Sequence, residues 1–161
     1  MRIAEANERD VEQFVRNEQD RTFFLDRLRH PGFRGGRVFL AIEGNRAVGY
    51  VYLRLETAEE FKLRFFLRRA PLLEKLRVDK DQQGRGVGRL LVGMAEATAW
   101  AHRRRRIALG VVVENPEPIG FYQRLGYAEW RHGLIKAYKN GPKSEIELCR
   151  VFVKKLTPPT S

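Results

Sequence analysis

The stretch from Leu72 to Leu91 reads LLEKLRVDKDQQGRGVGRLL and has three parts with different sequence patterns. Its first part, Leu72 to Val78, is apolar enough for a buried strand. A loop from Gln83 to Gly88 follows, in which glycine alternates with other residues. The segment 89–101 then carries apolar residues three or four positions apart, which is typical of a helix. We expect one stripe of this helix to face the core: Leu90, Leu91, Met94, Ala97 and Ala101.

The segment after this helix, 107–113, is apolar throughout, as in a strand buried on both faces. Strand, loop, helix and strand form a crossover unit, so we expect 72–78 and 107–113 to run parallel. Further strands are predicted at 2–6, 37–42, 47–55, 127–138 and 144–155, the last two around a turn at 140–142. Helices are predicted between 8 and 29 and from Pro116 to Gly126, and a helix or an irregular excursion over 56–69.

The pattern predicts a single domain. The chain has 161 residues, within the usual range for one domain. We expect an α/β fold of the α+β type over 1–156, with a mixed central sheet of six or seven strands and about four flanking helices. The last residues, 157–161, are expected to fray.

Composition excludes several classes of protein. One cysteine allows no disulfide within the chain, which favours a reduced, cytoplasmic protein. No signal peptide is evident at the start, and no apolar run approaches the about 20 residues that span a bilayer. We therefore expect no membrane partner. The three histidines lack the spacing of metal ligands, so no metal is expected. Cys149 is expected to be a small core residue.

The net charge of +11 raises the possibility of a polyanionic ligand. The longest basic run is Arg103 to Arg106. Two interpretations remain open. The arginines lie where the predicted helix ends, and cations are favoured there by the helix dipole. They could instead form part of a nucleic-acid surface.

The glycine loop predicts a phosphate site or a bare turn. Between a strand and a helix, such a loop exposes backbone N–H groups and the positive pole of the helix. Arg89 stands where the dinucleotide fingerprint needs its third glycine. The lysine of the mononucleotide loop is also absent after Gly88. Both nucleotide motifs are therefore disfavoured.

Two motifs together resemble the GNAT superfamily of N-acetyltransferases. The first is Gln83-Gly84-Arg85-Gly86-Val87-Gly88, which follows a strand that ends Leu76-Arg77-Val78. The second combines Asn115, Pro118, the pair Phe121-Tyr122 and the pair Gly126-Tyr127. Pro118 departs from the alanine usual in the family. The motifs cover residues 76–127, and the rest of the chain matches only in its pattern of strands and helices.

The resemblance implies acetyl-CoA as the acetyl donor, with no metal. Two parallel strands, here 72–78 and 107–113, would splay and hold the cofactor between them. Tyr122 would be the general acid and would also touch the cofactor, and Glu74 would be the candidate base, on one strand face with Leu76 and Val78. The expected cofactor-binding residues are Leu76, Val78, Gln83, Gly84, Arg85, Gly86, Val87, Gly88, Arg89, Asn115 and Tyr122.

The acceptor is not specified by these motifs. We expect direct attack by a primary amine of a small molecule in a ternary complex. Aminoacyl-tRNA, a protein amine and a non-catalytic acyl-CoA sensor are the alternatives. An acidic cluster, Glu56, Glu59 and Glu60, could attract a cationic substrate or form a solvated face. The chain could be a monomer or a homodimer.

Overall fold

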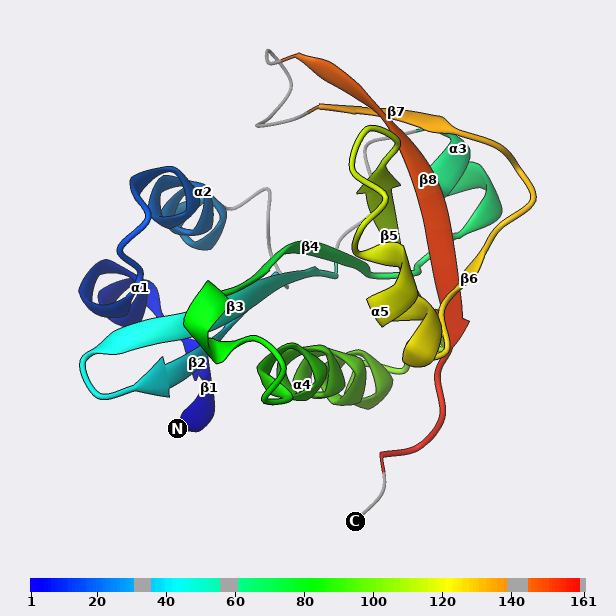
Figure 1. The fold of residues 1–161 in the computed structure, drawn as a ribbon. Coiled ribbons are helices and arrows are strands. Elements are labelled where there is room, and N and C mark those ends of the chain that lie inside the picture. The colour runs from blue at the N-terminus through cyan, green and yellow to red at the C-terminus, as the bar shows by residue number, and fades with distance from the viewer. Residues whose placement is uncertain (31–35, 56–60, 139–144, 160–161) are drawn as a thin grey trace.

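The computed structural model describes residues 1–30, 36–55, 61–138 and 145–159, and these form one mixed sheet with helices on both faces (Figure 1). The strands are β1 (Arg2–Ala6), β2 (Arg37–Glu43), β3 (Arg46–Arg54), β4 (Leu72–Val78), β5 (Arg106–Val112), β6 (Ala128–Glu129), β7 (Ile135–Tyr138) and β8 (Ile146–Lys155). Their order across the sheet is β1-β2-β3-β4-β5-β8-β6, and β7 also pairs with β8. Only β4 and β5 are parallel among these pairs.

This architecture confirms the predicted fold class and the parallel crossover. Within the described residues the sheet has eight strands, one more than the upper end of the six or seven expected. The extra strand arises because the predicted strand 127–138 divides into β6 and β7. Between them the chain turns at Gly133, whose φ is +82°.

The helices are α1 (Glu8–Phe14), α2 (Glu18–Arg29), α3 (Phe61–Phe66), α4 (Val87–Ala101) and α5 (Ile119–Arg124), with a 3₁₀ turn at Lys80–Gln82. Figure 1 shows α1 and α2 on one side of the sheet and α4 on the other. Both N-terminal helices begin at an asparagine cap. Asn7 accepts from the backbone N–H of Asp10, and Asn17 accepts from that of Asp20.

Each face of the sheet has its own apolar core. Phe24 of α2 packs on the face that carries Leu40 and Tyr52. On the opposite face, Val51 packs with Leu91 and its neighbours on α4. A third cluster joins α3 to β5, β7 and β8, and Cys149 is buried there beside Val151, as predicted.

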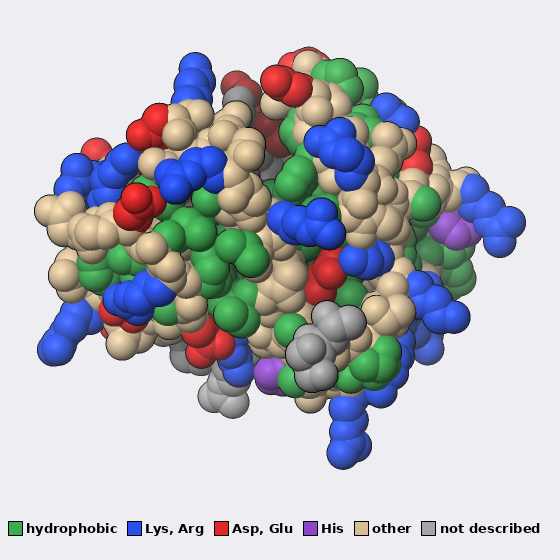
Figure 2. Space-filling model, turned by 60° about the horizontal axis from the view of Figure 1, so that its bottom comes forward, with side chains coloured by type: hydrophobic (Ala, Val, Ile, Leu, Met, Phe, Trp, Pro, Cys, Tyr) green, Lys and Arg blue, Asp and Glu red, His purple; other side chains and the backbone are tan. Residues whose placement is uncertain are grey.

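The buried stripe of α4 differs from the predicted one. Leu91 is fully buried, but Leu90 is 50% exposed and Met94 is 38% exposed. The buried positions are Val87, Leu91, Val92, Ala95 and Ala99. Exposed hydrophobic side chains are visible on the face of the molecule shown in Figure 2. The prediction failed because both sides of this helix carry apolar residues at helical spacing.

Gly49 explains which side of α4 turns inward. A Cβ atom at this glycine would lie 3.1 Å from a Val87 methyl carbon and 3.2 Å from a Leu91 methyl carbon. The missing side chain therefore lets α4 approach β3 closely through Val87 and Leu91. Periodicity within the helix carries no information about this partner on β3.

The remaining sequence predictions concern the start of α5, three segments outside the described residues, and membrane spans. Helix α5 begins after Pro118 at its N-cap, so Pro116 is not in its first turn as expected. The acidic cluster Glu56, Glu59 and Glu60, the turn at 140–142 and residues 160–161 lie outside the described residues. Along the described residues, no helix is both long and apolar enough to cross a bilayer.

We predict that Leu91→Ala and Leu90→Ala differ sharply in stability. Leu91→Ala leaves a cavity between α4 and the sheet and should lower the free energy of unfolding by about 2–5 kcal/mol. Leu90→Ala trims an exposed side chain and should cost less than about 1 kcal/mol. Urea denaturation of both variants measures the difference. Equal losses would contradict the observed orientation of α4.

Candidate active site

The central feature of the site is a gap between two neighbouring parallel strands. Strands β4 and β5 pair only at Leu72 with Ala108 and at Leu73 with Leu109. Beyond these residues, β4 stays paired to β3 and β5 stays paired to β8. The two strands therefore splay, and beyond Leu73 the β4 edge that faces β5 pairs with no other strand of the described residues.

A β-bulge bends β4 at the point where the splay begins. Tyr52 pairs with Glu74 and Tyr50 with Arg77, so β4 advances by one more residue than β3 over this interval. The inserted residue lies between Glu74 and Arg77, and this segment contains Lys75, whose φ is +58°. A bulge of this kind bends a strand and increases its twist. It turns the rest of β4 away from β5.

The bulge also changes which residues share a face, and here the prediction for Glu74 was wrong. Val78 pairs with Gly49, which faces α4, and Leu76 and Val78 pack against that same core. Glu74 pairs with Tyr52, which belongs to the core under α2. Simple alternation along β4 does not hold across an inserted residue. Glu74 therefore lies on the opposite face from Leu76 and Val78.

A cavity of about 340 Å³ occupies the splay. We call it the splay cavity. Four predicted site residues line it: Glu74, Leu76, Asn115 and Tyr122. Pro118 lines it too, and its carbonyl oxygen accepts a hydrogen bond from the Tyr122 backbone N–H at 3.2 Å. Proline at this position thus supports the first turn of α5.

Tyr122 lines the cavity, and its ring packs against two other aromatic rings. Its side chain is buried, and its ring meets those of Phe121 and Tyr127 edge to face at 5.1 and 5.8 Å. Burial raises the pKa of the Tyr122 phenol to about 12, because a phenolate is poorly solvated there. The group is therefore a neutral hydrogen-bond donor near neutral pH.

A polar network holds Tyr127, whose ring packs against that of Tyr122. The Tyr127 hydroxyl donates to Glu96 at 2.8 Å, and the Lys154 ammonium donates to both Glu96 oxygens at 3.0 and 3.1 Å. Burial and the nearby Glu96 carboxylate raise the pKa of Tyr127. The network ties α4 and β8 to the residue that packs on the Tyr122 ring. Tyr127, Glu96 and Lys154 do not line the cavity.

The glycine loop has the shape of an anion site. Gly84 and Gly86 have φ values of +82° and +81°, and nothing lies within 4 Å of a Cβ built on either. Gly88 approaches Phe121, since a Cβ there would lie 3.1 Å from that ring. The first N–H groups of α4 have no acceptor within the helix. Backbone donors are thus exposed where a phosphate could approach.

Side chains around the loop have different roles. Gln83 donates to the Val78 carbonyl oxygen at 3.0 Å, and Arg85 donates to Gln82 at 2.6 Å. Arg89 is exposed. The Val87 side chain is buried in the core, so only its backbone could touch a ligand. Neither the loop residues 83–89 nor Val78 line the splay cavity itself.

Some cavity residues gave no sequence signal. They include Phe23 and Arg27 from α2, Arg54 from β3, Lys75 at the bulge and Glu147 from β8. Arg54 is only 5% exposed, and its guanidinium lies 3.7 Å from the Glu74 carboxylate. From its place at the end of an apolar strand, the sequence predicts that the Arg54 side chain is exposed to solvent. Only the tertiary structure shows that it is buried.

The arginine run has a structural explanation for two of its members. The Arg104 side chain donates to the Leu55 carbonyl oxygen at 3.5 Å, and burial lowers the pKa of its guanidinium. Arg105 stacks over the Trp100 ring at 4.1 Å. Figure 2 shows that Lys and Arg side chains are spread over the face of the molecule in that view and are not gathered in one patch.

In the described ranges, no group of three or more His, Cys, Asp or Glu could hold a metal ion.

Comparison with known proteins agrees with this geometry. Residues 3–127 match the model of the acetyltransferase (GNAT) family. An uncharacterized N-acetyltransferase of Methanocaldococcus jannaschii is 42% identical over 57 residues, which are 35% of this chain and 25% of that protein. The chain thus matches only a quarter of that relative's length.

Solved structures share the fold at low sequence identity. A GNAT family acetyltransferase from Staphylococcus aureus has a TM-score of 0.64 at 19% identity, covering 97% of this chain and 99% of that one. An IAA acetyltransferase from Bacillus cereus has a TM-score of 0.62 at 16% identity, covering 96% and 99%. A spermidine N-acetyltransferase chimera from Vibrio cholerae and hSSAT has a TM-score of 0.62 at 15% identity, covering 96% of both chains.

We predict that position 75 tolerates glycine but not valine. Glycine accepts a positive φ without steric cost, so Lys75→Gly should change the free energy of unfolding by at most about 1 kcal/mol. Lys75→Val forces a β-branched residue into this conformation and should cost about 1–2 kcal/mol or more. Denaturant titration of the two variants measures this. If valine proves as stable as glycine, the bulge is not where the structure has it.

Proposed function

The chain belongs to the acetyltransferase (GNAT) family, and from this premise we propose that it transfers an acetyl group from acetyl-CoA to the primary amine of a small molecule. The observation that carries the proposal is the splay cavity, whose lining includes both the buried Tyr122 and residues 74–76 of β4. An extended ligand could bond to that edge as a strand would.

The residues present fit acetyl-CoA. The backbone of residues 83–89 would hold the pyrophosphate at the N-terminus of α4, with Arg85 and Arg89 adding positive charge. The segment from Leu76 to Val78 would bond the pantetheine arm along its open edge. Asn115 and Tyr122 would meet that arm from the far side of the splay. When bound, acetyl-CoA supplies an activated acetyl thioester.

Direct transfer requires the amine to lose a proton. Glu74 lines the cavity, and we assign it the role of proton acceptor, either directly or through a water. The amine nitrogen then forms the new C–N bond as the C–S bond breaks. The sulfur keeps the electron pair of that bond and takes up the second proton that the nitrogen releases as the amide forms, so the products are an amide and a thiol.

Tyr122 would act on the departing sulfur. With a pKa of about 12, its phenol holds its proton more tightly than a thiol, whose ordinary pKa is about 8.5. It therefore stabilises the negative charge on sulfur chiefly by donating a hydrogen bond. A backbone N–H on the open edge of β4 would stabilise the acetyl oxygen in the same way.

Other acceptors gain less support from these observations. Acetylation of aminoacyl-tRNA would need a phosphate-binding surface, and Arg104 and Arg105 are already engaged within the chain. A protein amine and a non-catalytic acyl-CoA sensor are the remaining alternatives. Thiol release from acetyl-CoA with small amines, peptides and charged tRNA separates all four.

We predict that Tyr122→Phe binds acetyl-CoA as tightly as the parent protein but lowers kcat by about 100-fold. The aromatic ring and its packing remain, and only the hydroxyl, which is the hydrogen-bond donor, is lost. Calorimetry measures binding, and free-thiol release measures kcat. The parent protein should show no loss of rate from phenol ionisation below about pH 11, because the donor stays protonated.

Tyr127→Phe is the matched control. It removes a buried hydroxyl at the next aromatic ring, so it should lower stability but change kcat by less than about fivefold. A Tyr122→Phe variant with near-normal kcat would remove Tyr122 from the chemistry. Failure of the parent protein to bind acetyl-CoA would refute the proposed function itself.

A further inference from the structure

The splay cavity continues through the sheet to the face opposite α4. Its lining includes Leu73 and Tyr122, which belong to the apolar core on the α4 face. It also includes Leu72 and Cys149, which belong to the cluster that joins α3 to β5, β7 and β8. Because Leu72 and Leu73 are neighbours on one strand, their side chains point to opposite faces. The cavity therefore has a second end, on the face away from the proposed acetyl-CoA site at the N-terminus of α4.

The second end of the cavity has a continuous apolar lining. We call six of its residues the apolar wall: Leu63 from α3, Val112 from β5, Ile135 and Ala137 from β7, and Cys149 and Val151 from β8. All six pack in one cluster. The strand register keeps them together, since Ile135 pairs with Cys149 across two neighbouring strands. Figure 1 shows β7 and β8 side by side with α3 next to them, at the end of the sheet away from α1.

Small residues let the cavity reach this wall. Gly110 lines the cavity and is exposed, although the residues before and after it on β5 are buried. A Cβ atom at Gly110 would lie 3.3 Å from the Cβ atom of Cys149, so a side chain here would occupy the space beside the wall. Val112 and Ala137 are only half-buried. The apolar wall is therefore accessible to a ligand and is not only the surface of a closed core.

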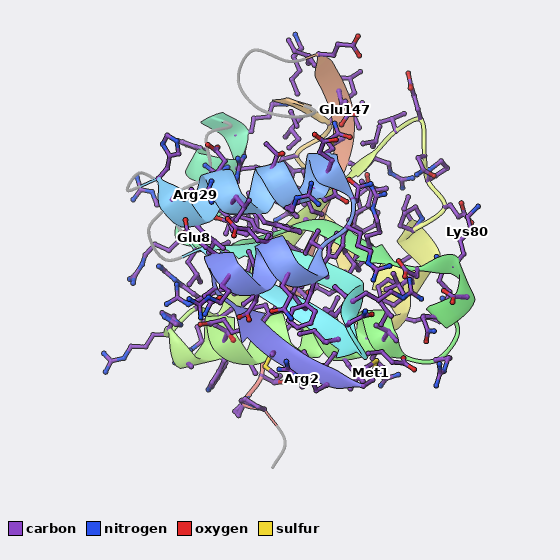
Figure 3. All side chains as sticks on the ribbon, turned by 90° about the vertical axis from the view of Figure 1, so that its left-hand side faces the viewer. Met1, Arg2, Glu8, Arg29, Lys80 and Glu147 are labelled. Atoms are coloured by element: carbon purple, nitrogen blue, oxygen red, sulfur yellow. The ribbon has the colours of Figure 1, made fainter. Side chains whose placement is uncertain are left out.

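Charged side chains line a different part of the cavity. Arg27, Arg54, Glu74 and Lys75 come from α2, β3 and β4, whereas the apolar wall comes from α3, β5, β7 and β8. Glu147 lies at the margin of the wall, two residues before Cys149 on β8, where Figure 3 shows it. A charged or hydroxylated group against the wall would lose its hydration and meet only hydrocarbon and one thiol among the side chains of the wall. A hydrocarbon group would be stabilised by the same burial.

We propose that the acceptor is a primary amine with a hydrocarbon body, and that this body binds against the apolar wall. The inference rests on the proposed function and narrows its substrate class. The amine would lie at the splay, where Glu74 accepts its proton, and the body would extend toward β7 and β8. Each methylene group removed from water should raise the affinity by about two- to fourfold. Val112 and Ala137 are here specificity-determining residues, because their size sets the room beside the wall.

The first test compares acceptors with the parent protein and acetyl-CoA. Straight-chain amines from ethylamine to pentylamine have nearly equal basicity, so their kcat/KM values report on the hydrocarbon body. Each added methylene group should raise kcat/KM by about two- to fourfold until the cavity is filled. Pentylamine is then compared with chains of the same length that end in a hydroxyl group (5-aminopentanol) or a second amine (cadaverine). Pentylamine should exceed both by about 10-fold or more, because the polar end is buried at a cost.

The second test fills the space beside the wall. Ala137→Leu adds three carbon atoms to a half-buried position of the cavity lining. It should lower the ratio of kcat/KM for pentylamine to kcat/KM for ethylamine by about 10-fold. Ala128→Leu is the matched control, because Ala128 is exposed on β6, which also pairs with β8, and does not line the cavity. It should change the ratio by less than about twofold.

The third test widens the same space and looks for a gain. Val112→Ala removes two methyl groups from the wall and should raise kcat/KM for the bulkier 2-phenylethylamine, relative to pentylamine, by about fivefold. A misfolded variant would lose activity with both amines and could not produce this gain. Val113→Ala is the matched control, because Val113 is the next residue, is 41% exposed and lies outside the cavity lining.

The outcomes separate this inference from the function on which it rests. If 5-aminopentanol or cadaverine is the better substrate, acetyl transfer stands and the hydrocarbon inference is overturned. It is also overturned if Ala137→Leu changes the preference between acetyl-CoA and butyryl-CoA but not the amine series, since the wall would then hold the acyl chain. A protein that binds acetyl-CoA but acetylates none of these amines overturns it as well. If acetyl-CoA does not bind at all, the proposed function fails first.

Discussion

The short pairing between β4 and β5 is the constraint on which the site depends. A parallel pair that continued along both strands would fill the middle of the sheet with hydrogen bonds and leave no cavity. The inserted residue at Lys75 ends the pairing after Leu73, at the cost of a left-handed backbone conformation. The remaining partners, β3 and β8, hold the separated strands in place. A gap can thus persist inside a stable sheet because each of its two edges is anchored on its far side.

The helices turn this gap into a site with two distinct ends. On one face, α4 packs closely against Gly49 and presents its N-terminus beside the end of β4, where the glycine loop leaves backbone donors open. On the other face, α2 is anchored by the buried Asp20 carboxylate, which accepts from the Tyr50 hydroxyl and pairs with Arg77 at 3.2 Å. This anchor fixes the helix that carries Phe23 and Arg27. The proposed donor and acceptor would therefore reach the splay from opposite faces of the sheet.

Local sequence predicted the donor side of this account and little of the acceptor side. The glycine loop, the paired strands and Tyr122 depend on short motifs whose chemistry is contained in neighbouring residues. The face of Glu74 could not be predicted, because a one-residue bulge reverses alternation and Lys75 carries no visible mark of it. The inward side of α4 depended on Gly49, a residue distant in sequence. Arg27, Arg54 and Glu147 meet only in the folded chain, so no spacing relates them.

The most direct test of the account is a crystal structure of the protein with coenzyme A. We predict that the pantetheine arm lies in the splay, bonded to the open edge of β4 from Leu76 to Val78. The pyrophosphate should lie on the backbone of residues 83–88, and the sulfur should come within hydrogen-bond distance of the Tyr122 hydroxyl. A structure in which β4 and β5 close together along their length, or in which coenzyme A binds elsewhere, would contradict the account.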